Sequence, residues 1–239
     1  MNEISSWIRK QIVKTNRKGV ILGLSGGVDS AVVAYLCREA GVETHLLMMP
    51  YGNDGSKEKA LDCFNGLSSK NKELFTLTEF DIKPAVKALL ILTDKVNQLA
   101  LANIRPRVRM TILYQYAQNQ HLAVIGTGNL SEITIGYFTK WGDGACDLNP
   151  IANFTKRGIY QLAETLGVPQ SIIEAKPSAG LWEGQTDEEE LGFTYQELDD
   201  FIEKGSSGNK EVDKSIKYRI QISRHKNKPI PTFKQIVVS

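Results

Sequence analysis

Short apolar segments alternate with helical patterns along the first half of the chain, and this alternation constrains the fold more than any other feature. The segments that read as strands are 19–24, 42–49, 73–80 and 121–126. The stretches between them carry apolar residues at helical spacing. Strands that alternate with helices of ten or more residues predict βαβ units and a parallel sheet. We therefore expect an α/β fold, an open parallel sheet with helices on both faces.

The second half of the chain has a mainly helical pattern. Thr194 and Glu197 have the spacing of a capping box, which predicts the start of a helix. A last amphipathic helix is expected to end near Arg224. We expect a single domain over 1–239, with an α/β core over about 1–150 and a helical C-terminal cap over about 151–239.

Composition excludes several classes of protein. The 29 Lys and Arg residues nearly balance 27 Asp and Glu, and a net charge of +2 argues against a dedicated nucleic-acid binder. The longest apolar run, 31–37, is far shorter than the ~18 residues that a membrane span needs. The three cysteines are widely spaced and include no CxxC pair, which argues against a disulfide framework or a zinc ribbon. We expect a cytoplasmic protein with no nucleic-acid or membrane partner.

The hexapeptide SGGVDS at 25–30 lies between a predicted buried strand and a predicted helix. Gly26 and Gly27 allow a tight turn that aims successive N–H groups at an anion, and the helix N-terminus adds partial positive charge there. Asp29 is a candidate Mg²⁺ ligand. The alternative is a glycine turn in which Asp29 or Ser30 merely caps the helix. No lysine precedes Ser30, so the segment is not the GxxxxGK[ST] loop of kinases and GTPases.

Two further segments carry polar residues that suit a nucleotide site. GTGNLSE at 126–132 follows the fourth strand and lacks the third glycine of a dinucleotide fingerprint, where Ser131 stands. Glu132 is a second candidate Mg²⁺ ligand; the alternative is an exposed residue in the first turn of the next helix. Lys156 begins an amphipathic helix and could serve phosphates, and the alternative is a solvated surface charge.

The SGGVDS loop resembles the SGGxDS loop of the N-type ATP pyrophosphatases, the PP-loop family. The resemblance implies that ATP is cleaved between its α and β phosphates while the loop holds the departing pyrophosphate. Enzymes of this family adenylylate an oxygen, and a nucleophile then displaces AMP.

Several longer segments, in their order along the chain, resemble those of ammonia-dependent NAD⁺ synthetases. Besides GTGNLSE they are NIRPRVRM at 103–110, GYFTKWGDGACDLNPI at 136–151, TKRGIYQLAETLGVP at 155–169, KPSAGLWEGQTDEEELG at 176–192 and HK at 225–226. The resemblance implies a ligase of NAD biosynthesis that forms a C–N bond. It implies ATP-dependent amidation of deamido-NAD⁺ with ammonia through an NAD-adenylate, releasing AMP and pyrophosphate.

The resemblance also implies a role for each matching residue. The ATP-binding residues are Gly23, Leu24, Ser25, Gly26, Gly27, Val28, Asp29, Ser30, Thr127, Lys156 and Ser178. Asp29 and Glu132 hold Mg²⁺, the implied cofactor. The deamido-NAD⁺ contacts are Arg107, Lys140, Asp147, His225 and Lys226. The catalytic residues are Asp29, Lys156 and Asp147, of which Asp147 orients ammonia or receives a proton. Many relatives have an arginine near the end of the second strand, where this sequence has Met48 and Met49.

The resemblance implies a homodimer with the dinucleotide site at the subunit interface. The candidate interface is the helical stretch 96–118, whose apolar residues are Leu99, Leu101, Ile104, Met110, Leu113 and Tyr114; a buried core explains them equally well. Ammonia is expected to arrive free or from a separate glutaminase. The segments 180–192 and 205–209 have few apolar anchors and are expected to close over the adenylate.

Two rival functions are weighed against this one. A tRNA-thiolating or GMP-amidating enzyme would share the loop, but thiolation calls for paired cysteines and a basic extension. A non-catalytic sensor of adenine nucleotides would keep the loop without turnover. The presence of Asp29, Glu132 and Lys156 together argues against the sensor.

Overall fold

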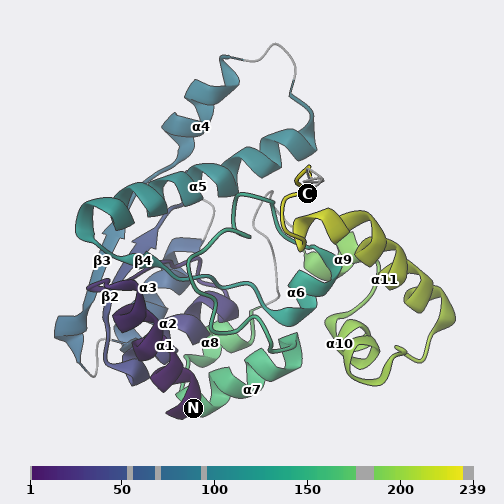
Figure 1. The fold of residues 1–239 in the computed structure, drawn as a ribbon, viewed down its shortest axis with the longest axis horizontal. Helices are drawn as coiled ribbons and strands as arrows, with labels where there is room; N and C mark the ends of the chain where they lie inside the picture. The colour runs from purple at the N-terminus through teal and green to yellow at the C-terminus, as the bar shows by residue number, and fades with distance from the viewer. Residues whose placement is uncertain (1, 53–55, 68–70, 93–95, 176–185, 234–239) are drawn as a thin grey trace, which may run out of the picture.

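The computed structural model describes residues 2–52, 56–67, 71–92, 96–175 and 186–233. Its central feature is a parallel sheet of β1 (Gly19–Gly23), β2 (Glu43–Met48), β3 (Phe75–Glu79) and β4 (Ala123–Val124) (Figure 1). The spatial order is β3-β2-β1-β4. In this register, Val20 of β1 lies opposite Thr44 on one side and Ala123 on the other. The parallel α/β fold predicted from the sequence is confirmed.

Helices cover both faces of the sheet (Figure 1). Side chains alternate along a strand, so Val20 and Leu22 enter one apolar core and Ile21 enters the other. The larger core is covered by α1 (Asn2–Thr15), α2 (Val28–Ala40), α3 (Ser56–Leu67), α7 (Lys156–Leu166) and α8 (Gln170–Ile173). The second core is covered by α4 (Lys83–Leu90) and α5 (Gln98–Gln120).

A third apolar cluster lies beside the sheet and joins the C-terminal helices. It brings together α6 (Leu130–Ile135), α9 (Asp187–Leu191), α10 (Tyr195–Lys204) and α11 (Lys210–Ser223), which gather on the right in Figure 1. The predicted capping box of Thr194 and Glu197 is present at the start of α10. Two short 3-10 helices, Lys72–Leu74 and Arg224–Lys226, complete the described elements. Among the described helices, none is long and apolar enough to cross a membrane.

The first two strands match their predicted bounds to within one residue at each end, and the other two differ by more. The fourth strand was expected over 121–126 but β4 has two residues. It begins late because His121 ends α5 in a left-handed conformation with φ of +57°, and beyond β4 Ile125 forms an isolated bridge with Leu148. The third strand was expected from residue 73, yet β3 begins at Phe75. Asn71 adopts a left-handed φ of +56°, and the 3-10 turn that follows delays the strand.

The strand order places the candidate loops at a topological switch point. From β1 the chain goes outward to β2 and β3, then crosses back to add β4 on the other side of β1. The connections that follow β1 and β4 therefore lie on either side of a crevice at the carboxyl edge of the sheet. Open α/β sheets bind ligands at such a crevice. The β1–α2 turn and the β4–α6 turn are the two segments that the sequence singled out.

Candidate active site

The SGGVDS segment forms the turn between β1 and α2. Gly23 ends β1, Leu24 follows, and Val28 begins α2. Gly26 has a φ of +78°, a left-handed conformation that glycine adopts without steric cost. The N-cap of α2 is Gly27, which has no side chain to bond the first amides of the helix. These amides are therefore available to an anion at the edge of the sheet.

Two serine hydroxyls brace this turn. Ser30 Oγ donates to the carbonyl of Gly27 at 2.9 Å and lies 3.0 Å from Ser25 Oγ. The Gly27 amide in turn donates to Ser25 Oγ at 3.2 Å. Ser30 thus bonds back into the turn, and Asp29 bonds to residues at least 100 positions away. The alternative in which Asp29 or Ser30 merely caps α2 is wrong.

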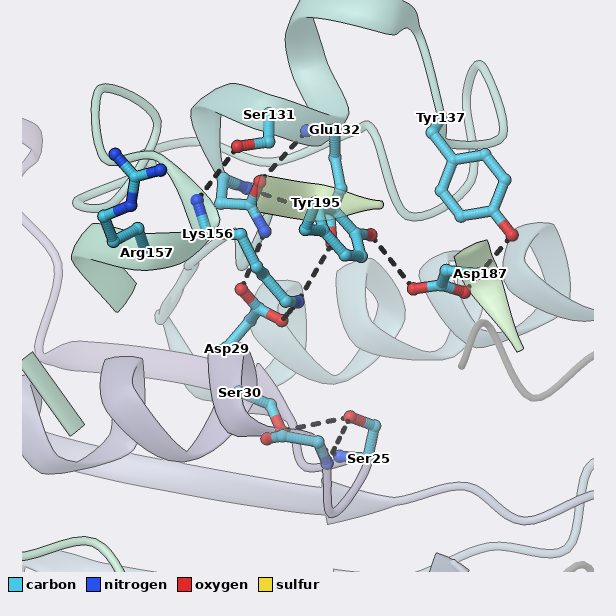
Figure 2. Close-up of polar contacts among 12 residues, drawn as sticks. Ser25, Asp29, Ser30, Ser131, Glu132, Tyr137, Lys156, Arg157, Asp187 and Tyr195 are labelled. Carbon is cyan, nitrogen blue, oxygen red and sulfur yellow. Dashed lines mark hydrogen bonds and ion pairs between the residues drawn. The ribbon is translucent and has the colours of Figure 1, made fainter. Parts of the chain in front are cut away.

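Asp29 joins the β1–α2 turn to the other side of the crevice (Figure 2). Lys156 Nζ donates to Asp29 Oδ2 at 2.6 Å, and Asn129 Nδ2 donates to Asp29 Oδ1 at 2.8 Å. The side chain of Lys156 is only 4% exposed, so the alternative of a solvated surface lysine is wrong. Burial disfavours the charged ammonium, but Asp29 and then Glu132 outweigh it and hold the pKa of Lys156 above its ordinary value.

Glu132 contacts Lys156 from α6, whereas Asp29 contacts it from the β1–α2 turn (residues 25–30, called the phosphate turn below). Its carboxylate is 3.5 Å from Lys156 Nζ and accepts a hydrogen bond from the Asn129 amide at 3.3 Å. Its side chain is 19% exposed, so the alternative of an exposed helical residue is wrong. Burial, followed by the charge of Asp29, raises the pKa of Glu132 to about 8. Two carboxylates share one ammonium here, and the site favours additional positive charge.

A buried carboxylate and two tyrosines extend the site toward α9 and α10 (Figure 2). Tyr195 OH donates to Asp187 Oδ2 at 3.0 Å, and Tyr137 OH is 3.2 Å from Asp187 Oδ1. The Tyr195 ring centroid lies 5.0 Å from Lys156 Nζ, within the range of a cation–π contact. Burial, Glu132 and Asp187 raise the pKa of Tyr195, so its hydroxyl is protonated at neutral pH. The wall of the site thus combines an aromatic face with fixed hydroxyl donors.

Four of the predicted deamido-NAD⁺ contacts lie together. The Arg107 guanidinium donates to the Lys140 carbonyl at 3.3 Å, and Lys140 Nζ donates to the His225 carbonyl at 3.0 Å. Lys226 Nζ donates to two carbonyls in the 136–138 segment at 2.7 and 2.6 Å. Each ammonium has three N–H donors, so Lys140 keeps others for a ligand. The structure gathers residues from α5, the 136–151 segment and the 3-10 helix that follows α11 into one basic cluster.

The fifth predicted contact, Asp147, has other partners. Its carboxylate accepts from the Val124 amide at 2.8 Å and lies 3.2 Å from Tyr114 OH. Thr127 lies in the β4–α6 turn, two residues before Asn129. Ser178 lies outside the described residues, as does the 180–185 part of the expected lid. The other part of that segment contains α9.

The two arginines that lie two positions apart on α5 contact different neighbours. Arg107 reaches Lys140, whereas Arg109 Nε donates to the Met49 carbonyl at 2.9 Å. Arg109 therefore holds the chain just after β2, at Met49. The 205–209 segment, the other expected lid, bonds Asp213 through the amide and hydroxyl of Ser207.

Sequence reasoning missed Asn129, Asp187 and Tyr195 as members of the site. A signal for Asn129 was present, because Asn129 and Glu132 have the capping-box spacing that was recognised at Thr194 and Glu197. Asp187 was included only in a segment taken for a lid. Tyr195 carried no distinguishing pattern, since its place beside Lys156 depends on how α10 packs.

Comparison with known proteins decides the family. The chain matches the NAD synthase family model over residues 1–235. The chain belongs to the NAD synthase family. It is 44% identical over 231 residues to an NH₃-dependent NAD⁺ synthetase of Carboxydothermus hydrogenoformans, covering 95% of this chain and 93% of that protein.

Two solved structures resemble the fold over almost the whole chain. An NMN synthetase of Francisella tularensis has a TM-score of 0.92 at 36% identity, covering 98% of this chain and 97% of that one. An NH₃-dependent NAD synthetase of Campylobacter jejuni, in complex with a nitrate ion, has a TM-score of 0.82 at 28% identity with the same coverage. The fold of this NAD synthase family member is thus shared with both proteins.

Proposed function

We propose that this member of the NAD synthase family is an ammonia-dependent NAD⁺ synthetase. It is a ligase that uses ATP and ammonia to convert the nicotinate carboxylate of deamido-NAD⁺ into the amide. The observation that carries this function is the contact of Asp29, in the phosphate turn, with Lys156 across the crevice. This contact sets a phosphate-binding turn beside buried charges of both signs. Support also comes from relatives named NH₃-dependent NAD⁺ synthetase at 42–44% identity.

The reaction has two balanced steps. A carboxylate oxygen of deamido-NAD⁺ attacks the α-phosphorus of ATP, the bond to the bridging oxygen breaks, and pyrophosphate leaves. Ammonia then attacks the carbonyl carbon of the adenylate, loses a proton, and expels AMP. The amides at the start of α2 hold the departing pyrophosphate, and Lys156 stabilises the negative charge that accumulates at the phosphates.

Mg²⁺ fits the residues of this site. Hard cations bind carboxylate oxygens, and Mg²⁺ usually takes one or two carboxylates together with substrate phosphates and water. Asp29 and Glu132 supply these carboxylates; burial and then the charge of Asp29 raise the pKa of Glu132, and a bound cation would favour its ionised form. When bound, the ion would neutralise phosphate charge and polarise the P–O bond. Lys156 adds a fixed cation between the same carboxylates.

We assign deamido-NAD⁺ to the basic cluster of Arg107, Lys140, His225 and Lys226. Arg107 and Lys140 bind the diphosphate of deamido-NAD⁺, with His225 and Lys226 framing the same surface. Asp147 orients ammonia or accepts its proton. Thr127 and Ser178 supply hydroxyl contacts to ATP. We assign all of 1–239 to one NAD synthetase domain, because α6 follows the sheet yet packs with the C-terminal helices.

A homodimer through α5 is also part of the proposal. Four of the six apolar residues named on this helix are buried or half-buried against the second core: Leu101, Ile104, Met110 and Leu113. Leu99 and Tyr114 are 66% and 37% exposed. Because they are exposed, these two side chains are the ones that a subunit interface on α5 would bury. Sedimentation of the native protein and of Leu99→Asp tests this, with a shift to monomer expected for the variant.

The nitrogen donor is tested with purified protein, ATP, Mg²⁺ and deamido-NAD⁺, supplied with either ammonium or glutamine. The expected result is NAD⁺ with ammonium and none with glutamine, with one AMP for each NAD⁺. ADP in place of AMP would contradict the proposed phosphate chemistry. Absence of turnover with ammonium would contradict the function itself and favour a nucleotide sensor.

Amidation of nicotinate mononucleotide is a second candidate function. The observation that favours it is the TM-score of 0.92 to a protein named NMN synthetase. The chemistry at the carboxylate is the same, so the substrates differ only in the adenylyl half. The ratio of kcat/KM for deamido-NAD⁺ to kcat/KM for nicotinate mononucleotide decides between them. A ratio below one would make the mononucleotide the preferred substrate.

A further inference from the structure

Asp199 is a buried carboxylate that links three helices behind the active site. It lies on α10 and is 1% exposed. Its Oδ2 accepts a hydrogen bond from the Arg157 amide at 2.7 Å, and its Oδ1 accepts one from Ser131 Oγ on α6. Ser131, itself fully buried, accepts from the Lys156 amide at 2.9 Å. The Asp199 carboxylate thus connects α10 directly to Ser131 on α6 and to Arg157 on α7. Through Ser131 it is also connected to the amide of Lys156.

These contacts account for the first amides of α7. The first turn of a helix leaves N–H groups without partners inside the helix. The amide of Lys156 bonds Ser131, that of Arg157 bonds Asp199, and that of Gly158 bonds Thr155 Oγ1. A carboxylate here also interacts favourably with the positive end of the helix dipole. The position and direction of α7 at its first residue are therefore determined by Asp199 and Ser131.

The same network reaches the two charged residues of the active site through the backbone. Lys156 is the first residue of α7, and its Nζ contacts Asp29. Ser131 directly precedes Glu132 on α6. Tyr195, one turn before Asp199 on α10, presents its ring to Lys156 Nζ. Figure 2 shows Ser131, Lys156 and Tyr195 around this point.

We propose that Asp199 is a positioning residue, which acts through Ser131 and the start of α7 to hold Lys156 and Glu132 in register with the phosphate turn. The inference rests on the proposed function, in which Lys156 contacts the phosphates of ATP. In this account α10 affects the reaction through the position of Lys156 and Glu132, and Asp199 itself does not contact the substrate. A displacement of about 1 Å in such groups can cost about 100-fold in rate.

Asp199→Asn tests this role with little change in shape. A carboxylate accepts at both oxygens, whereas an amide accepts at one and donates at the other. If the amide oxygen accepts from Arg157, the NH₂ group faces Ser131, which then receives two donors and has no acceptor for its own hydrogen. The matched control is Asp200→Asn. Asp200 is the next residue on α10. It accepts hydrogen bonds from the side chains of Arg157 and Lys204, whereas Asp199 accepts one from a backbone amide at the start of α7.

We expect Asp199→Asn to lower kcat/KM for ATP about 10- to 100-fold while KM for deamido-NAD⁺ stays within about twofold. The dinucleotide cluster of Arg107 and Lys140 shares no contact with Asp199 among the described residues. Asp200→Asn should remain within about twofold of the native protein for both substrates. The proposal would be overturned if Asp199→Asn kept the native kcat/KM for ATP. It would also be overturned if KM for deamido-NAD⁺ rose by the same factor by which kcat/KM for ATP fell. Absence of NAD⁺ formation by the native protein would instead contradict the proposed function.

A second measurement tests whether Asp199 acts through Lys156. The Kd of Mg·ATP, measured by calorimetry, is compared for the native protein, Asp199→Asn, Lys156→Ala and the double variant. We expect Asp199→Asn to weaken binding in the native background and to have less than a twofold effect once Lys156 is absent. Full additivity would overturn the proposal. Ser131→Ala, measured the same way, carries the test if Asp199→Asn does not fold.

Discussion

Glu132→Gln is expected to stabilise the ligand-free protein while impairing its activity. The pKa of Glu132 is raised from 4.5 to about 8 by burial and by Asp29. Between these values the folded state holds a proton that the unfolded state has released, so native stability falls as pH rises from about 4.5 to 8. At about 1.4 kcal/mol per pKa unit, the upper bound of this loss is about 5 kcal/mol.

The expected gain in the free energy of unfolding of Glu132→Gln is smaller than this upper bound. Glutamine loses the ion pair with Lys156 and the charge-assisted hydrogen bond from the Asn129 amide, which offsets roughly 1–3 kcal/mol. A net gain of about 2 kcal/mol in the free energy of unfolding at pH 8 corresponds to a rise of ~4–8 °C in Tm for a chain of this length. The gain should shrink toward pH 5, where the native glutamate is neutral in the folded state.

The assay is thermal unfolding followed by circular dichroism from pH 5 to pH 9, in EDTA and without ATP. Glu197→Gln is the matched control, because Glu197 forms the other capping box and its hydrogen bonds with Thr194 are exposed to solvent. It loses a capping bond without relieving a buried charge, so its Tm should not rise. A Glu132→Gln variant less stable than the native protein at pH 8, or a difference that does not vary with pH, would refute the reasoning.

Three further predictions concern the reaction. Arg107→Ala should raise KM for deamido-NAD⁺ roughly 10-fold and leave KM for ATP unchanged, measured by steady-state kinetics, because it removes one charge-assisted contact to a phosphate; a selective loss of ATP binding would contradict that role. Asp29→Ala should lower kcat at least about 100-fold, since it removes a cation ligand and the partner of Lys156; full turnover would rule out the metal assignment. At fixed total ammonium, turnover below the ammonium pKa should fall about tenfold for each pH unit, because neutral ammonia is the nucleophile; a flat profile would indicate another donor.

The sequence predicted the parts of the fold that depend on local pattern. Short apolar segments in β1 and β2, helical spacing in α7 and capping chemistry at Thr194 all predicted elements that the structure contains. The phosphate turn was also predictable, since glycines between a buried strand and a helix permit the left-handed φ that this turn adopts at Gly26. The length of β4 was not, because the left-handed conformation of His121 at the end of α5 has no signal in the apolar pattern of 121–126.

The members of the site that the sequence missed depend on tertiary packing. Tyr195 reaches Lys156, and Asp187 reaches Tyr195, only because α9 and α10 pack on α6 through the third apolar cluster. Asp199 owes its role to the meeting of three helices, which no local spacing encodes. The burial of Lys156 and Glu132 likewise follows from the approach of the β1–α2 turn, more than 100 residues earlier in the chain.

Transfer of oxygen from the carboxylate to AMP tests the central claim most directly. Deamido-NAD⁺ labelled with ¹⁸O in the nicotinate carboxylate is converted with ATP and ammonium, and the products are analysed by mass spectrometry. Attack on the α-phosphorus predicts one ¹⁸O atom in AMP and none in pyrophosphate. Label in inorganic phosphate together with ADP would show attack on the γ-phosphorus and would contradict the assignment of the phosphate turn.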